Sequence, residues 1–108
     1  MNKFHALKAV SINGTVCASR KERDRYNALL MLEKAGEISD LRFQVRFELI
    51  PNQRASSGVW RKITYIADFV YQKDGKTIVE DTKGKRTEVY RIKKKLMLWT
   101  HGIEIKET

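Results

Sequence analysis

The chain has 108 residues, of which 42% are hydrophobic and 32% are charged. This length and balance predict one globular domain with a modest core, and they exclude a largely disordered chain. No apolar run approaches the roughly 18 residues that a membrane-spanning helix needs, and the single Cys17 excludes an internal disulfide.

The charge is strongly unbalanced. With 22 Lys and Arg against 13 Asp and Glu, the formal net charge is +9. This surplus predicts a polyanionic partner, because Lys and Arg displace counterions from phosphates; a solubilising surface charge is the alternative. The N-terminus has no secretory apolar region, so we expect a cytoplasmic protein without a membrane partner.

A short ribbon is expected over residues 1–18, ahead of a core over residues 19–108. Asn13-Gly14 is a two-residue hairpin signal, with Val10 and Ile12 before it and Val16 after it. Such a ribbon would cover a sheet edge or meet a partner subunit.

A helix is predicted to begin at Ser19 and end at Gly36. Ser19 and Glu22 have the spacing of a capping box, and glycine suits a left-handed C-terminal cap. Tyr26, Leu29 and Leu30 form its apolar stripe, and Glu22 lies on that stripe, one turn before Tyr26.

Cations crowd the first turns of this helix, where the macrodipole disfavours them. They are Arg20, Lys21, Arg23 and Arg25. Phosphate contact is one explanation, and a solvated face is the other.

Residues 41–50 alternate as a core strand. Phe43, Val45, Phe47 and Leu49 are expected to face inward, and Arg42, Gln44, Arg46 and Glu48 outward. Residues 52–58 read as a loop, in which Arg54 could follow a DNA backbone, and residues 59–72 as a bent or interrupted strand.

Two apolar runs flank Asp74-Gly75, which predicts a tight hairpin. Its register sets Val70 opposite Val79 and Asp68 opposite Asp81, with Cβ atoms about 4.5–5.5 Å apart. Ile66, Val70 and Val79 are expected on one face, and Phe69, Tyr71 and Ile78 on the other.

Two opposed carboxylates destabilise a sheet unless something positive lies between them. A divalent cation with oxygen ligands is the natural candidate. Lys83, two residues beyond Asp81, is expected on the same face, whereas Glu80 points to the other face unless a bulge exchanges the two.

A second helix is predicted from Thr87 to His101, ended by Gly102. Val89, Ile92, Leu96 and Trp99 are its expected buried stripe. The region is strongly basic, and Tyr90 and Lys94 share a face that could border the acids. A short strand over residues 103–106 follows, which completes an α/β fold with a mixed sheet.

After the N-terminal ribbon, the expected order is αβββαβ. Asp68, followed by Asp81-Thr82-Lys83 on the next strand, resembles the acid and acid-x-Lys signature of the PD-(D/E)xK nuclease superfamily. The segments S-x-x-E, E-K-A-G-E-I-S-D-L-R-F-Q, Y-I-A-D-F-V-Y, V-E-D-T-K-G and Y-R-I-K-K-K-L resemble a small phage-encoded family assigned to that superfamily. The resemblance covers residues 15–108 and implies the restriction-endonuclease-like core.

The resemblance implies a metal-dependent DNA endonuclease. The ion would be Mg²⁺, or Mn²⁺ in its place, held by Asp68, Asp81, Glu22 and the Thr82 backbone carbonyl. Glu80 is the alternative ligand if a bulge exchanges it with Asp81. Lys83 would be catalytic. No organic cofactor is implied. Capping and metal binding by Glu22 compete, since one rotamer cannot serve both.

Cations on both helices and in the break before the second one would bind DNA: Arg20, Lys21, Arg23, Lys85, Arg86, Arg91 and Lys94. Gln44 and Tyr90 could support the site from a second layer, although Gln44 is also an ordinary strand residue. Related nucleases imply a homodimer, branched DNA such as a Holliday junction as substrate, and the host cytoplasm as location. A catalytically inactive nucleic-acid-binding protein of the same fold and an assembly protein are the alternatives.

Overall fold

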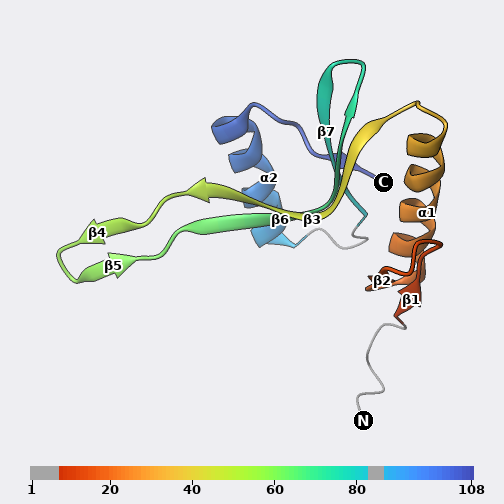
Figure 1. The fold of residues 1–108 in the computed structure, drawn as a ribbon. Coiled ribbons are helices and arrows are strands. Elements are labelled where there is room, and N and C mark those ends of the chain that lie inside the picture. Colours follow the sequence, from red (N-terminus) through yellow and green to blue (C-terminus); the bar gives the residue numbers. More distant parts are fainter. Residues whose placement is uncertain (1–7, 83–86) are drawn as a thin grey trace, which may run out of the picture.

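The computed structural model describes residues 8–82 and 87–108. A mixed four-stranded sheet lies between two helices (Figure 1), with strand order β3-β6-β7-β8. Its strands are β3 (Ser39–Ile50), β6 (Ile63–Lys73), β7 (Lys76–Asp81) and β8 (Lys106–Glu107). The helices are α1 (Arg20–Lys34) and α2 (Glu88–His101).

Two small hairpins lie outside this sheet. β1 (Ala9–Val10) pairs with β2 (Val16–Cys17), and β4 (Gln53–Ala55) pairs with β5 (Gly58–Trp60). The radius of gyration is 16.0 Å, against about 13 Å for a compact chain of this length. The β4–β5 hairpin contributes to this extended shape, since it projects far from both helices (Figure 1).

The mixed α/β architecture and the expected αβββαβ order are both confirmed, with β4 and β5 inserted after the first strand of the sheet. β7 and β8 are parallel, whereas β3, β6 and β7 pair antiparallel. Within the described part of the chain, no helix combines the length and apolar character needed to cross a membrane.

The central hairpin has the predicted register. Asp74 and Gly75 have φ of 51° and 76°, the conformation of the two-residue turn whose twist suits paired strands. Lys73 pairs with Lys76, and Val70 pairs with Val79. The turn alone therefore sets which residues of β6 and β7 are neighbours.

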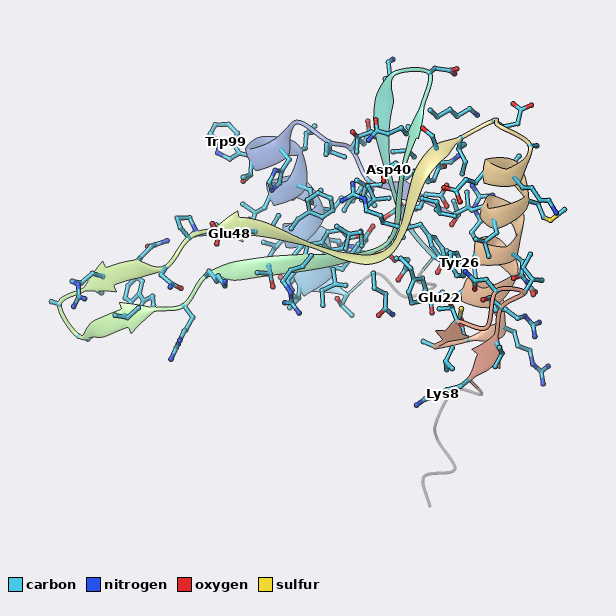
Figure 2. All side chains as sticks on the ribbon, viewed as in Figure 1. Lys8, Glu22, Tyr26, Asp40, Glu48 and Trp99 are labelled. Atoms are coloured by element: carbon cyan, nitrogen blue, oxygen red, sulfur yellow. The ribbon has the colours of Figure 1, made fainter. Side chains whose placement is uncertain are left out.

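Helix α1 begins and ends close to its predicted bounds. The Ser19 side chain accepts a hydrogen bond from the Glu22 backbone at 3.1 Å, and Gly36 follows the helix with φ of 79°. Tyr26 stacks on Phe69 of β6, with ring centroids 5.6 Å apart. In Figure 2, Glu22 and Tyr26 project from α1 toward the sheet.

The N-terminal ribbon forms, but its turn is one residue longer than predicted. Val10 pairs with Val16, and the Ser11 backbone donates to the Thr15 carbonyl at 2.9 Å. Asn13 is held in this turn because its side-chain Nδ2 donates to the Tyr26 hydroxyl at 3.1 Å. The ribbon is thus bound to α1 through polar contacts that the turn signal did not contain.

The prediction for the buried face of α2 is wrong, although its ends are right. Thr87 caps the helix, and Gly102 ends it with φ of 68°. The buried residues are Tyr90 and Met97. Of the expected stripe only Leu96 is half-buried, whereas Val89, Ile92 and Trp99 are exposed; Trp99 projects outward in Figure 2.

The physical reason is that α2 has two apolar stripes, and the sheet selects between them. Tyr90 uses both its ring and its hydroxyl, because it approaches the Tyr65 ring and hydrogen-bonds Glu107. His101, farther along the same helix, packs its ring edge-on against Phe47. These contacts hold the stripe that contains Tyr90 and Met97 against the sheet.

Residues 52–58 are not the expected loop, because β4 and β5 pair across them.

The predicted faces of β6 also need correction. Tyr65 and Ala67 belong to the same core cluster as Val70, whereas Phe69 packs in the other cluster. The strand therefore exchanges faces near Asp68, and Ile66 is left 42% exposed.

The partner strand is irregular at the same level. Gln44, between the paired residues Phe43 and Val45 of β3, has a positive φ of 54°. Its side chain is exposed. β3 exchanges faces at this residue as well, because Phe43 packs in the cluster of Phe69 and Val45 packs in the cluster of Val70.

Candidate active site

The hairpin register places Asp68, in the middle of β6, near Asp81, the last residue of β7. The last paired residues of the β6–β7 ladder are Phe69 and Glu80, and the two aspartates lie one step beyond them. Asp68 is 7% exposed and Asp81 is 1% exposed. Two carboxylates at so little exposure require polar partners, because burial of an unpaired charge is costly.

Asp68 is bound by the residue that follows Asp81. Its Oδ2 accepts hydrogen bonds from the Thr82 backbone N–H at 2.7 Å and from the Thr82 hydroxyl at 2.9 Å. Oδ1 of Asp68 accepts no hydrogen bond from the residues that the structure describes. Asp68 thus fixes the backbone at the end of β7, directly beside Asp81.

Asp81 is bound from β6. The Tyr65 hydroxyl donates to Oδ2 of Asp81 at 2.7 Å. Burial raises the pKa of Tyr65 strongly, and the hydrogen bond to Asp81 and the negative charges of Asp81 and Asp68 raise it further. Tyr65 therefore stays a neutral donor, close to both carboxylates.

A second tyrosine and a third carboxylate extend this group toward α2 and β8. The Tyr90 hydroxyl donates to Oε2 of Glu107 at 2.7 Å, and Nζ of Lys94 lies 3.3 Å from the same oxygen. Asp81 pairs with Glu107 across the parallel strands. Tyr90 and Lys94, both expected to border the acids, contact Glu107, the residue that pairs with Asp81.

Tyr65 and Glu107 were missed by reasoning from the sequence. Regular alternation puts Tyr65 and Asp68 on opposite faces of β6, and only the exchange of faces near Asp68 lets Tyr65 bond Asp81 while Asp68 bonds Thr82. Glu107 lies just past the predicted strand over residues 103–106, since β8 is Lys106–Glu107. No local pattern marks either residue.

Glu80 lies on the opposite face of the sheet, where α1 covers it. Arg25 holds its carboxylate with two hydrogen bonds, from Nε at 2.8 Å and from Nη2 at 2.6 Å. The Tyr71 hydroxyl donates to the same group, and Nζ of Lys106 lies 3.9 Å away. Glu80 is fully buried, so this cluster joins α1 to three strands.

The protonation states of this cluster follow from its geometry. Burial by itself raises the pKa of Glu80, but the hydrogen bonds from Arg25 and Tyr71 and the charges of Arg25 and Lys106 together lower it below its ordinary value. Burial and the bond to Glu80 raise the pKa of Tyr71 to about 12. Glu80 is therefore a carboxylate held by a guanidinium, and it could serve as a metal ligand only by displacing Arg25.

Glu22 reaches back past Ser19, the residue that it was expected to cap, and bonds the residue before it. Its Oε1 accepts a hydrogen bond from the Ala18 backbone N–H at 2.7 Å, and its side chain is buried. Across residues 8–82 and 87–108, no group of three or more Asp, Glu, His or Cys side chains is placed to hold one metal ion. The structure therefore brings Asp68 and Asp81 together but does not group Glu22 with them.

The predicted DNA-binding cations differ in their surroundings. Arg20, Lys21 and Arg91 are exposed. Arg23 pairs with Asp24 at 2.9 Å, and Lys94 pairs with Glu107. The other predictions, Lys85, Arg86 and the catalytic Lys83, lie outside the described residues.

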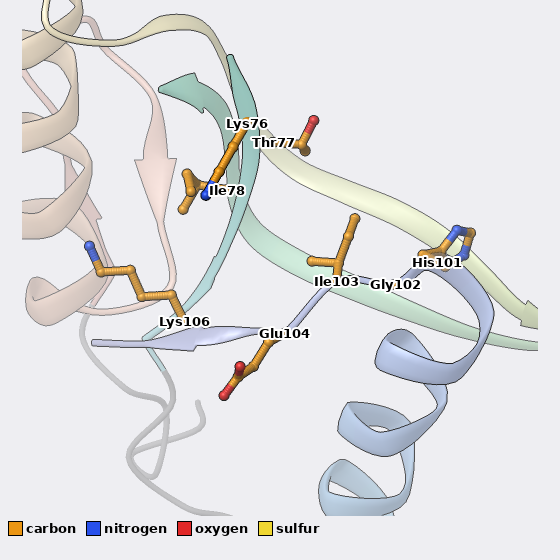
Figure 3. A pocket seen from close by; sticks show the side chains of 8 residues that line it. All are labelled: Lys76, Thr77, Ile78, His101, Gly102, Ile103, Glu104 and Lys106. Atoms are coloured by element: carbon orange, nitrogen blue, oxygen red, sulfur yellow. The ribbon is translucent and has the colours of Figure 1, made fainter. Parts of the chain in front are cut away.

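A groove of about 480 Å³ lies between β7 and the segment that joins α2 to β8 (Figure 3). It is lined by Lys76, Thr77, Ile78, His101, Gly102, Ile103, Glu104 and Lys106. Neither aspartate lines it, so the acid pair and this groove are separate features.

Comparison with known proteins places the chain in a family without assigning it a reaction. No curated protein and no solved structure matches it. The chain belongs to the family described as Protein of unknown function (DUF1064), whose model matches residues 1–107.

Proposed function

We propose that the protein is a metal-dependent DNA endonuclease of the PD-(D/E)xK type, which hydrolyses phosphodiester bonds. The observation that carries this proposal is the buried pair Asp68 and Asp81, on the neighbouring strands β6 and β7 in a chain of net charge +9. Two buried carboxylates close together supply the oxygen ligands that a divalent cation prefers, and the positive net charge suits a phosphate-rich partner.

The residues present suit Mg²⁺, with Mn²⁺ as a substitute. Mg²⁺ prefers oxygen ligands, and one or two carboxylates suffice because it retains several waters. Asp68 and Asp81, with the Thr82 backbone carbonyl, would hold it, and Glu22 would join them only by releasing the Ala18 N–H. Such an ion supplies Lewis acidity and makes water a better nucleophile.

The chain's own residues prepare this site. Tyr65 orients Asp81 through its hydrogen bond, and Thr82 orients Asp68. Lys83, the next residue along the chain, would stabilise negative charge that develops on the phosphate. Glu80, held by Arg25, stays outside the chemistry.

DNA would be bound by exposed cations of both helices, such as Arg20, Lys21 and Arg91. A chain this small has little room for a domain that reads sequence, so we propose a preference for DNA structure, with branched DNA such as a Holliday junction as the substrate. A homodimer would cleave both strands, in the cytoplasm of a phage-infected host.

A second function, DNA binding without cleavage, is supported by the hydrogen bonds to the two aspartates. Asp68 and Asp81 already accept hydrogen bonds from Thr82 and Tyr65, which would stabilise a site that holds no metal. This favours a nucleic-acid-binding protein that keeps the fold and lacks cleavage.

One experiment separates the two functions. Four-way junction, flap and linear duplex DNA are incubated with the protein in Mg²⁺, in Mn²⁺ and in chelator, and binding is measured in parallel. The endonuclease predicts metal-dependent cleavage that Asp81→Asn and Asp68→Asn each abolish while DNA binding persists. Asp40→Asn, at an exposed aspartate, is the matched control and should cleave normally. Absence of cleavage for every substrate and metal, with binding intact, would establish the second function.

A further inference from the structure

The β4–β5 hairpin is an arm with no cover on either face. Of residues 51–63 only Ala55 is half-buried, and all others are exposed. Among the described elements, neither helix packs on it, and it extends away from the sheet (Figure 1). We call residues 51–62 the arm.

An arm of this kind is not expected to be stable in isolation. A two-stranded hairpin in water is marginally stable at best, and this one leaves Val59 50% exposed and Trp60 60% exposed. Its base is secured by Asn52, whose Oδ1 accepts a hydrogen bond from the Lys62 backbone at 2.7 Å. A secured but uncovered ribbon with apolar side chains indicates a surface that another molecule covers.

The charge of the arm indicates what that molecule is. Residues 51–67 contain Arg54, Arg61 and Lys62 and no Asp or Glu. Residues that pair directly share one face of a ribbon, so Arg54 lies beside Val59 on one face, and Gln53 lies beside Trp60 on the other. Each face therefore combines a hydrogen-bond donor with an apolar surface, which suits an anionic partner that also presents flat apolar groups.

We propose that the arm lies in a groove of duplex DNA that flanks the acid pair. Arg54, Arg61 and Lys62 contact phosphates, and Trp60 packs against sugars or bases. The major groove is about 12 Å wide and admits a two-stranded ribbon, whose strands are about 4.8 Å apart.

Arg46 adds a cation between the arm and the site. It is exposed on β3 opposite Ile66 of β6, and its position along the sheet lies between the arm and Asp68. This inference rests on the proposed function only in taking DNA as the partner, and it does not require cleavage.

Binding is measured by fluorescence anisotropy with labelled duplex in chelator, so that cleavage plays no part. The variant R54Q/R61Q/K62Q removes three charges from the arm. The matched control K34Q/K73Q/K76Q removes three exposed charges from the end of α1 and the β6–β7 turn. Since each phosphate contact contributes about 0.9 to the slope of log K against log salt, the arm variant should lose roughly 2–3 of that slope. The control should lose less than one phosphate contact's share, about 0.9.

Equal losses in both variants would overturn the proposal, because they would show that only net charge matters. A reporter for Trp60 gives a second readout: Trp60 and Trp99 are the chain's two tryptophans, so Trp99→Phe leaves Trp60 as the only one. Its fluorescence should change on addition of duplex and become protected from acrylamide. Unchanged emission and quenching would contradict the proposal.

The competing occupant of the arm is a second copy of the chain. Sedimentation velocity without DNA tests it with Trp60→Ala. A shift from dimer to monomer on that substitution would assign the arm to self-association and overturn the DNA proposal, whereas an unchanged oligomeric state with weakened DNA binding supports it. Asp81→Asn retains the arm, so loss of its cleavage with normal DNA binding in the anisotropy assay leaves this inference standing. If the parent protein cleaves DNA and the arm variant binds duplex as tightly as the parent does, this inference fails and the proposed function stands.

Discussion

Substitution of Arg25 tests whether a cation near the N-terminus of α1 binds DNA or stabilises the fold. Replacing it with methionine keeps the apolar stem but removes both hydrogen bonds to Glu80. Glu80 is fully buried, and removal of one partner of a buried ion pair costs about 3–5 kcal/mol. Tyr71 and Lys106 remain near the carboxylate, so we expect the lower end, about 3 kcal/mol, for Arg25→Met.

Arg23→Met is the matched control. Arg23 pairs with Asp24 at 2.9 Å, but the two side chains are 32% and 67% exposed. A pair at such exposure contributes about 1 kcal/mol or less. Urea denaturation followed by circular dichroism measures both variants against the parent protein.

The dependence on pH provides a second check on Arg25. The folded-state pKa of Glu80 lies below its ordinary value, so its contribution to stability is present above the unfolded pKa and is lost as pH falls through the folded pKa. The cost of Arg25→Met should therefore be largest near neutral pH and shrink below about pH 4.5. If Arg25→Met costs no more than Arg23→Met at neutral pH, or if its cost does not shrink in acid, the assignment of Arg25 to the buried cluster is wrong.

Three further predictions concern the tyrosines and the end of α2. Tyr65→Phe removes the hydroxyl that donates to Asp81 and should cost about 1–2 kcal/mol in urea denaturation; an unchanged midpoint would show that this hydrogen bond contributes no net stability. The pKa of Tyr71 is raised to about 12, so the folded state holds its proton more tightly. Stability should then fall as pH rises from about 10 to 12, and Tyr71→Phe should flatten that fall, as measured by denaturation at each pH. Gly102 has φ of 68° and open space around an added Cβ. Gly102→Ala should therefore cost about 1 kcal/mol through backbone strain alone, and a larger loss would indicate a clash.

Much of the local structure could be predicted from the sequence because its causes act within a few residues. Ser19 and Thr87 accept hydrogen bonds from backbone N–H groups three residues later. Both helix starts could therefore be predicted from the sequence. Gly75 and Gly102 supply positive φ where a turn and a helix end require it. The turn at Asp74-Gly75 then set the register that brings Asp68 of β6 near Asp81 at the end of β7.

The sequence could not show what surrounds the buried carboxylates Glu80 and Asp81, because side chains of other elements bind them. Arg25 and Glu80 are 55 positions apart, and no periodicity links them. Tyr65 reaches Asp81 only because β6 exchanges faces near Asp68. The arm appeared as a loop, since a ribbon exposed on both faces has no apolar alternation to reveal it.

The sequence by itself determined the order of elements, their caps and the pairing of the central hairpin, because backbone sterics and nearest-neighbour hydrogen bonds act over a few residues. Only the tertiary structure decided which stripe of α2 is buried, which carboxylate Arg25 neutralises and which hydroxyl holds Asp81. Those choices depend on side-chain packing and on the cost of burying unpaired charge. Both are properties of contacts between segments that the chain order does not bring together.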